Sequence, residues 1–302
     1  MMEMNLSKLT TEKRNPGSVN IDQISTIKLL QVINNEDKKV ANKVEMVLPE
    51  VAIVVEKVME ALSNGGRLFY VGAGTSGRIG ITDASECPPT FMTDPEMIQT
   101  VMAGGNTAFF QAVEGAEDNE QQGAVDLKTR GLTKKDVVIG ITASGRTPYP
   151  IGALKYAQSV GAYAVSLTCN KNSEISRYAD TGIEVVVGPE VLTGSTRMKA
   201  ATAHKMILNM ISTSTMVKLG KVYENLMVDL HASNYKLKER AKSIIMEITD
   251  VPYEKAGAVL DATNNEVKPA IVMIEAGVDF EKAKDALDKS KGYVRKAIEY
   301  LV

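Results

Sequence analysis

The first regular hydrophobic pattern along the chain has the spacing of an α-helix. Apolar residues recur every three or four positions over residues 36–62, which predicts one long helix with a buried face. Asn64, Gly65 and Gly66 follow, and such residues commonly end helices. A weaker pattern over residues 22–33 predicts a shorter amphipathic helix, preceded by a polar arm.

The next part of the chain alternates between short apolar runs and segments of helix length. The five runs are rich in β-branched residues and cover residues 68–71, 98–103, 137–142, 163–168 and 183–188. Nearly continuous apolar runs with helical crossovers are typical of buried parallel strands. We therefore predict an α/β fold with a doubly wound, mainly parallel five-stranded sheet, whose ligands bind at the carboxyl ends of the strands.

Beyond residue 194 the strand pattern stops and helical spacing returns. A long helix is predicted over residues 195–219, and short helices over residues 253–260, 266–275, 279–287 and 293–301. The pattern thus predicts three segments, which are an N-terminal arm and helix (residues 1–35), a sheet domain (36–235) and a small all-helical domain (236–302).

Composition and charge exclude several classes of function. The 302 residues include 35 basic and 37 acidic side chains, a net charge of −2, so we expect neither a nucleic-acid partner nor a membrane surface. No stretch reaches the roughly 20 apolar residues of a membrane span, and the start lacks the apolar segment of a signal peptide. Two cysteines and two histidines are too few for a disulfide framework or a histidine-built metal site. We expect a cytoplasmic protein that binds no metal.

A glycine-rich loop follows the first predicted strand. Residues 72–77, Gly-Ala-Gly-Thr-Ser-Gly, satisfy the G-x-G-x-x-G pattern, which alone is weak evidence for a nucleotide. A dinucleotide site requires an acidic residue at the end of the second strand, but the residues there are Ala103, Gly104 and Gly105. No Gly-Lys-Ser/Thr follows either, so we expect neither NAD nor a P-loop nucleotide. The remaining alternatives are a phosphate-binding loop and a tight turn that simply needs glycine.

A second loop of the same design follows the third predicted strand. Residues 143–148, Ala-Ser-Gly-Arg-Thr-Pro, again place small hydroxyl side chains beside glycine where a helix begins. Free backbone N–H groups, the positive helix end and the hydroxyls can together bind a phosphate dianion. We predict that both loops form one phosphomonoester cradle, with the candidate residues Thr75, Ser76, Gly77, Ser144, Gly145 and Thr147. In the alternative, the hydroxyl residues are only helix N-caps.

Two glutamates are candidates for acid–base catalysis. Glu86 precedes Cys87 and two prolines. Because residues before proline resist the α conformation, we expect Glu86 in the last turn of a helix, where the dipole raises the pKa of a carboxyl group. Glu117 opens a predicted helix, where the charged carboxylate is favoured, and such a pair can act as acid and base. An acidic turn is more commonly a solvated surface, and this alternative stays open for Glu117.

Other chemically active side chains are weaker candidates. His204 is expected on a helix surface or at an interface, and Cys87 has no histidine nearby in the sequence to make it a nucleophile. Arg197 and Lys199 are expected either to contact an anionic ligand or to be surface or dimer charges.

Six sequence blocks resemble the N-acetylmuramic acid 6-phosphate etherases. They are GAGTSGR (residues 72–78), DASECPPT (83–90), VEGAED (113–118), ASGRTPY (143–149), TGSTRMK (193–199) and NLMVD (225–229). The resemblance runs from about residue 18 to the C-terminal end. It implies a sugar isomerase (SIS) domain, a doubly wound sheet that binds phosphosugars, in a homodimer that takes part in cell-wall sugar recycling.

The resemblance also implies a reaction and roles for residues. The family removes the lactyl ether from N-acetylmuramate 6-phosphate, giving N-acetylglucosamine 6-phosphate and D-lactate, by elimination and addition of water without a cofactor. Glu86 matches the proton donor of the family, and Glu117 matches the second acid/base. The hydroxyl residues of the two loops would hold the 6-phosphate.

Two other functions stay open. A regulator related to the glucokinase regulatory protein would bind a phosphosugar without turning it over. An aldose–ketose phosphosugar isomerase would need a base but no acid aimed at C3. The presence of both Glu86 and Glu117 favours the etherase.

Overall fold

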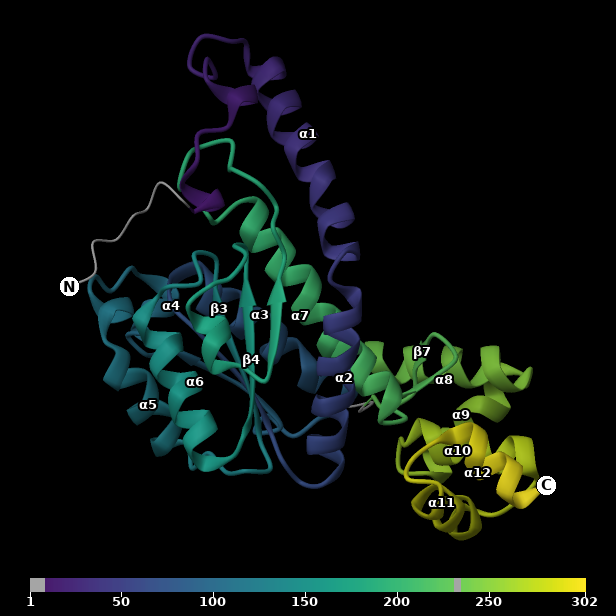
Figure 1. Ribbon diagram of the computed structural model, residues 1–302. Coiled ribbons are helices and arrows are strands. Elements are labelled where there is room, and N and C mark those ends of the chain that lie inside the picture. The colour runs from purple at the N-terminus through teal and green to yellow at the C-terminus, as the bar shows by residue number, and fades with distance from the viewer. Residues whose placement is uncertain (1–8, 231–234) are drawn as a thin grey trace. The chain divides into compact units, whose positions relative to one another are not determined.

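The computed structural model describes residues 9–230 and 235–302, which belong to two compact units (Figure 1). One unit comprises Met1–Ala84 and Glu96–Ser212, and the other comprises Ser85–Pro95 and Thr213–Val302. Each unit has its own hydrophobic core. The first eight residues of the predicted arm lie outside the described residues, and the predicted segment boundaries stay predictions.

A parallel five-stranded sheet forms the centre of the first unit. Its strands are β1 (Leu68–Gly72), β2 (Ile98–Met102), β3 (Val137–Thr142), β4 (Tyr163–Thr168) and β5 (Thr181–Glu184), in the order β2-β1-β3-β4-β5. β1 to β4 begin at the predicted residues, and the predicted fold class is confirmed. β5 begins two residues before its predicted start and ends at Glu184, which pairs with Thr168 at the end of β4.

Helices cover both faces of this sheet (Figure 1). On one face lie α5 (Glu120–Thr129) and α6 (Pro148–Val160). Their residues Leu127 and Leu154 share a buried cluster with Phe69 of β1 and Val138 of β3. This apolar layer explains why the strands are hydrophobic along their whole length.

On the opposite face a buried carboxylate joins two helices to the sheet. Asp83 of α3 (Gly74–Phe91) accepts hydrogen bonds from the hydroxyl of Tyr70 in β1 (2.8 Å) and from two residues of α7 (Lys199–Lys218). These are the Asn209 side chain (2.6 Å) and the Ser212 hydroxyl (3.0 Å). Because a buried carboxylate with several donors has little freedom to move, this network fixes α3 and the first part of α7 on the sheet. α7 itself begins four residues after its predicted start at residue 195.

The helix predicted over residues 36–62 is instead two helices. α1 (Thr26–Glu45) and α2 (Leu48–Ser63) are separated by two residues. Pro49 lies in the first turn of α2, where its missing N–H breaks no hydrogen bond. Within one continuous helix, Pro49 would remove a hydrogen bond and clash with the preceding turn. The helix predicted over residues 22–33 begins four residues later than predicted, at Thr26, and its remaining residues form the start of α1. The short elements of this unit are η2 (Thr10–Glu12), η3 (Pro16–Ser18), α4 (Thr107–Phe110), η4 (Ala116–Asp118) and η5 (Ile175–Tyr178).

The described residues of the second unit form a helical bundle with a small hairpin. Its elements are β6 (Val222–Tyr223), β7 (Leu226–Met227), α8 (Tyr235–Thr249), α9 (Tyr253–Ala262), α10 (Val267–Ala276), α11 (Phe280–Lys289) and α12 (Val294–Leu301). The last four helices match the predicted short helices to within two residues. Along the described part of the chain, no helix combines the length and apolar content needed to cross a bilayer.

Candidate active site

The carboxyl ends of β1 and β3 lie side by side in the middle of the sheet. The two strands pair in register, with Gly72 opposite Ile141. From β1 the chain goes on to β2 on one side, whereas from β3 it goes on to β4 on the other side. Such a reversal opens a crevice beyond the strand ends, and doubly wound folds bind their ligands there. Both predicted phosphate loops begin at this position.

The first loop is a close turn from strand to helix. α3 begins at Gly74, which has a φ of +53°. A Cβ atom on Gly77 would lie 2.9 Å from the carbonyl oxygen of Gly72 and 2.8 Å from Met102 Cγ. The glycines of the G-x-G-x-x-G pattern therefore allow the first turn of α3 to pack against the ends of β1 and β2.

In the second loop, hydroxyl groups cluster at the end of β3. Thr142 Oγ1 lies 2.8 Å from Thr147 Oγ1 and 3.3 Å from Ser144 Oγ. Ser144 Oγ also accepts a hydrogen bond from the Arg146 N–H (3.2 Å). Thr147 is the N-cap residue of α6, but its side chain makes no capping hydrogen bond. For Thr147, the alternative that its hydroxyl only caps the helix is therefore wrong.

Three of the predicted cradle residues, Thr75, Ser76 and Gly77, lie in the first turn of α3, and the other three lie between β3 and α6. Their side chains are half-buried, and the two glycines are buried. Their shared use as a phosphate cradle stays a prediction for Thr75, Ser76, Gly77, Ser144, Gly145 and Thr147.

A polar network around the half-buried Glu184 supports the second loop. The Glu184 carboxylate accepts hydrogen bonds from the N–H of Ser173 (3.0 Å) and of Asn172 (2.8 Å) and from the Ser176 hydroxyl (2.8 Å). Burial by itself raises the pKa of Glu184, but these hydrogen bonds outweigh it and hold the pKa below the ordinary value of 4.5. Ser173 in turn packs under Gly145, whose Cβ position would lie 2.2 Å from Ser173 Cβ.

We expect Glu184→Gln to destabilise the protein at pH 7 by about 1.5–3 kcal/mol, because hydrogen bonds to a charged acceptor are lost. The folded-state pKa lies below 4.5, so the contribution of the carboxylate is complete above that pH and is lost as the pH falls through the folded-state pKa. Urea unfolding at pH 7 and pH 3 should therefore show a smaller difference between variant and wild type at pH 3. Glu174→Gln, at an exposed glutamate immediately before η5, is the control. An equal difference at both pH values would contradict the prediction.

Asn170 is a positioning residue that the sequence did not reveal. It follows β4 and is buried. Its Nδ2 donates to the Ala143 carbonyl (3.0 Å) and to Thr11 Oγ1 (3.2 Å), and its Oδ1 accepts from the Thr10 N–H (2.7 Å). The side chain thus joins the N-terminal segment to the second loop. In the sequence it is marked only as a polar residue just after a predicted strand, because its three partners are distant in the sequence.

Glu117 lies beside a cavity next to the first loop. It is exposed in η4, and α5 begins later, at Glu120, with Asn119 as its cap. The prediction that Glu117 opens the helix itself is therefore wrong by three residues, because the Asn119 side chain takes the capping position and accepts from the Gln122 N–H. The cavity has a volume of about 220 Å³, and Gly74, Arg78, Glu114 and Glu117 are among the residues that line it.

Glu86 is not in the last turn of its helix, as the prolines had led us to expect. α3 continues through Pro88 and Pro89 to Phe91, and the carbonyl of Pro88 accepts a hydrogen bond from the Met92 N–H (2.9 Å). The prolines remove hydrogen bonds in this helix without ending it, so the dipole argument for a raised pKa does not hold. Glu86 is exposed and belongs to the segment Ser85–Pro95 of the second unit. Its pairing with Glu117 stays a prediction.

His204 is buried, contrary to the prediction of a surface position. Its Nε2 lies 3.3 Å from Cys169 Sγ, and burial lowers the pKa of the imidazole to about 4. The histidine is therefore neutral at pH 7 and does not face solvent.

Lys199 is also buried, so it is neither a surface charge nor exposed to a ligand. Its Nζ lies 2.5 Å from Glu36 Oε2 of α1. Its backbone N–H and that of Ala200 donate to the buried Glu190 carboxylate (3.0 and 2.9 Å), which caps the start of α7. Arg197 is exposed.

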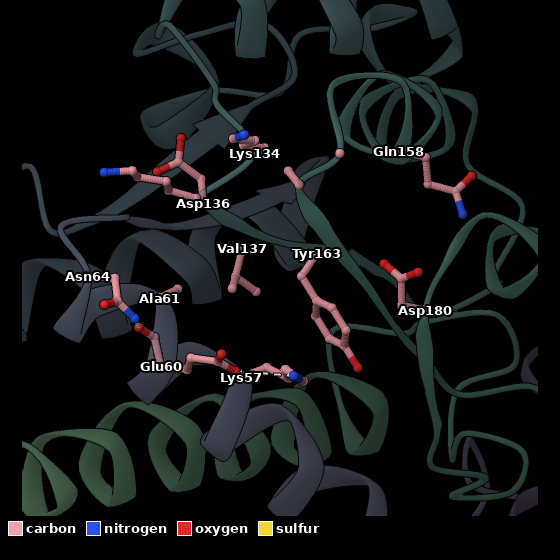
Figure 2. A pocket seen from close by; sticks show the side chains of 13 residues that line it. Lys57, Glu60, Ala61, Asn64, Lys134, Asp136, Val137, Gln158, Tyr163 and Asp180 are labelled. Carbon is pink, nitrogen blue, oxygen red and sulfur yellow. Dashed lines mark hydrogen bonds and ion pairs between the residues drawn. The ribbon is translucent and has the colours of Figure 1, made fainter.

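A larger cavity, of about 560 Å³, lies at the opposite edge of the sheet (Figure 2). It borders the amino ends of β3 and β4, at Val137 and Tyr163. Figure 2 shows Glu60 near Lys57, and the two form an ion pair at 3.1 Å. Asp136 pairs with Arg67 at 3.0 Å. Because its acids are engaged and doubly wound sheets bind ligands at the other edge, this cavity is not the candidate active site.

The comparisons with known proteins define the class. Two family models match the chain, the glucokinase regulatory protein N-terminal SIS domain over residues 50–158 and the SIS domain over residues 119–214. A solved phosphoheptose isomerase from Francisella tularensis has the same fold, with a TM-score of 0.51 and 18% identity, and the match covers 64% of this chain and 100% of that one. The chain is a SIS-domain protein.

Two curated relatives narrow this class. The N-acetylmuramic acid 6-phosphate etherase of Bacillus subtilis (strain 168) is 57% identical over 297 residues, which are 98% of each chain. The enzyme of that name from Bacillus pumilus (strain SAFR-032) is 55% identical over 300 residues, 99% of each chain. The chain belongs to the N-acetylmuramic acid 6-phosphate etherase family.

Proposed function

We propose that this protein cleaves the lactyl ether of N-acetylmuramic acid 6-phosphate to give N-acetylglucosamine 6-phosphate and D-lactate. The observation that carries the proposal is the pairing of β1 with β3, because the segments that follow these strands both carry hydroxyl residues and glycine and begin side by side at the carboxyl edge of the sheet. A phosphate is well matched to such a site, because it accepts hydrogen bonds from backbone N–H groups and hydroxyls. The sugar and its lactyl ether are inferred from the family to which the chain belongs.

The chemistry requires one base and one acid. Opening the sugar ring exposes an aldehyde at C1, which acidifies the hydrogen at C2. Glu117 takes the C2 proton and Glu86 protonates the lactate oxygen, so the C2–H and C3–O bonds break while a C2=C3 double bond forms. Water then adds its oxygen to C3 and a proton returns to C2. The chain's own carboxyl groups suffice for each proton transfer in this scheme.

The direct test is to incubate the purified full-length protein with N-acetylmuramic acid 6-phosphate and to measure D-lactate and N-acetylglucosamine 6-phosphate. We expect the two products in equal amounts, and no release from N-acetylmuramic acid without the phosphate. Binding of the phosphosugar without turnover would instead indicate a regulator. Aldose–ketose interconversion without lactate would indicate an isomerase, and either result would reject the proposal.

We expect Ser76→Ala and Ser144→Ala each to weaken substrate binding by about 1.5–3 kcal/mol, because each removes a hydrogen bond to a charged group. This corresponds to a rise in KM of roughly 10- to 150-fold, measured by lactate release. Ser159→Ala, at an exposed residue of α6, is the control and should leave KM unchanged. Wild-type KM values in both loop variants would place the phosphate elsewhere.

We further propose that the protein is a cytoplasmic homodimer in cell-wall sugar recycling. Ile27 and Leu30 of α1 and Ile53 of α2 are exposed apolar residues, as is common at subunit interfaces. Neither cysteine forms a disulfide, which is usual in a reducing compartment. Sedimentation equilibrium should give twice the chain mass of 32.6 kDa.

A further inference from the structure

The cavity beside Glu117 contains a guanidinium group that the proposed reaction has not yet used. Arg78 lies in the first part of α3, and its Nε and Nη2 donate to the carbonyls of Phe109 (2.9 Å) and Ala108 (2.8 Å) of α4. These two hydrogen bonds hold the group by one edge. The guanidinium is therefore fixed at the wall of the cavity, which is also lined by the segment that carries Glu117.

The other edge of this guanidinium is open to a ligand. Arginine has five N–H donors, and within the described residues Nη1 of Arg78 and the second hydrogen of Nη2 have no protein acceptor. No acidic side chain among the described residues forms an ion pair with Arg78, although Glu114 and Glu117 line the same cavity. The Nη1–Nη2 edge is the one that binds a carboxylate with two parallel hydrogen bonds.

The rest of the cavity suits a small group with an apolar part. Its volume of about 220 Å³ is several times the roughly 30 Å³ share of one liquid water, which is room for a few heavy atoms. Apart from Arg78, the described lining residues are glutamates, glycines and apolar residues such as Met102, Ala112 and Val113. An anionic group inside it therefore has one cationic partner among the described lining residues, and this partner is Arg78.

We infer that Arg78 binds the carboxylate of the lactyl group and makes the enzyme selective for the acid ether. The inference rests on the proposed function, because the muramic acid substrate is a sugar whose C3 oxygen bears a lactic acid residue. The lactyl methyl group lies against the apolar wall. Anchored in this way, the ether bond that breaks is held at the edge of the cavity, and the neighbouring C2–H bond faces Glu117, which takes the C2 proton in the proposed reaction.

The test compares two substrates on the full-length protein. One is N-acetylmuramic acid 6-phosphate, and the other is the same compound with its lactyl carboxylate converted to the neutral carboxamide. We expect the wild type to prefer the carboxylate substrate by about 100-fold in kcat/KM. In Arg78→Gln this preference should fall to nearly one, because kcat/KM falls for the acid and changes little for the amide. Arg78→Lys keeps a charge without the two-pronged geometry and should recover part of the preference.

Arg146→Gln is the matched control. Arg146 follows Ser-Gly in the second loop as Arg78 does in the first, but it does not line this cavity. Its replacement should leave the ratio between the two substrates at the wild-type value. An equal loss on both substrates in Arg78→Gln would show that Arg78 holds the phosphate or only the fold, and it would overturn the inference.

Binding of the product tests the inference separately from the proposed activity. Titration of D-lactate in the presence of N-acetylglucosamine 6-phosphate, followed by NMR, should show saturable binding to the wild type and a loss of at least tenfold in affinity in Arg78→Gln. If the wild type released no lactate but bound it through Arg78, the proposed function would fail and the carboxylate site would stand. Equal lactate affinity in both proteins would reject the site.

Discussion

Glu117→Gln is expected to lower kcat for lactate release by about 10²- to 10⁴-fold, the usual contribution of a positioned acid or base. Glutamine has nearly the same shape as glutamate but cannot accept the C2 proton. KM should change little, because the phosphate loops on β1 and β3 remain intact. Lactate release by the purified variant under saturating substrate measures the effect.

A nearby acid provides the control for this prediction. Glu120 begins α5 three residues after Glu117, and it pairs with Lys155 at 2.6 Å on the surface. Because an exposed ion pair contributes little, Glu120→Gln should retain wild-type kcat. If Glu117→Gln also retained it, the cavity beside Glu117 would not be where the C2 proton is removed.

Glu86→Gln should lower kcat by a similar factor, and isotope exchange separates the two roles. In D₂O the base alone exchanges the hydrogen at C2 of the substrate. The Glu86 variant should therefore keep this exchange while it loses lactate release, and the Glu117 variant should lose both. The reverse pattern would exchange the roles of the two residues, and unchanged turnover in both variants would reject the pair.

The sheet and its loops could be predicted from the sequence because they depend on local signals. Buried parallel strands need apolar residues on both faces, so β1 to β4 are continuous runs that begin where the pattern predicts. The loops after β1 and β3 need glycine for close packing, as at Gly77 and Gly145. Both therefore leave a recognisable sequence.

Features that depend on distant partners could not be predicted. Lys199 looks like a surface charge until α1 brings Glu36 to within 2.5 Å of its Nζ. Arg78 has no partner nearby in the sequence, because its acceptors are carbonyl groups 30 and 31 residues later in α4. The local rule also failed at Pro88, since α3 continues through it and packing outweighs the helix preference of single residues.

Gly145→Ala is expected to destabilise the fold and damage the second loop together. Gly145 has a φ of +75°, and an alanine in such backbone costs about 1–3 kcal/mol. Its Cβ would also lie 2.2 Å from Ser173 Cβ, and overpacking of this kind costs about a further 1–3 kcal/mol. The loop cannot shift easily, because the Gly145 carbonyl accepts from the Ile175 N–H (3.0 Å). Urea unfolding should show a loss of about 2–6 kcal/mol, with a raised KM.

Gly131→Ala separates the two causes of this loss. Gly131 also has a positive φ (+64°), but no atom lies within 4 Å of its Cβ position. Its alanine variant should therefore show only the backbone cost of about 1–3 kcal/mol, with an unchanged KM because the loop after α5 does not touch the crevice. The difference between the two variants measures the contact with Ser173. Ser173 also donates its N–H and hydroxyl to Glu184. The same difference therefore measures how firmly the hydrogen bonds to Glu184 hold the loop. Equal losses in both variants would mean that the loop moves freely.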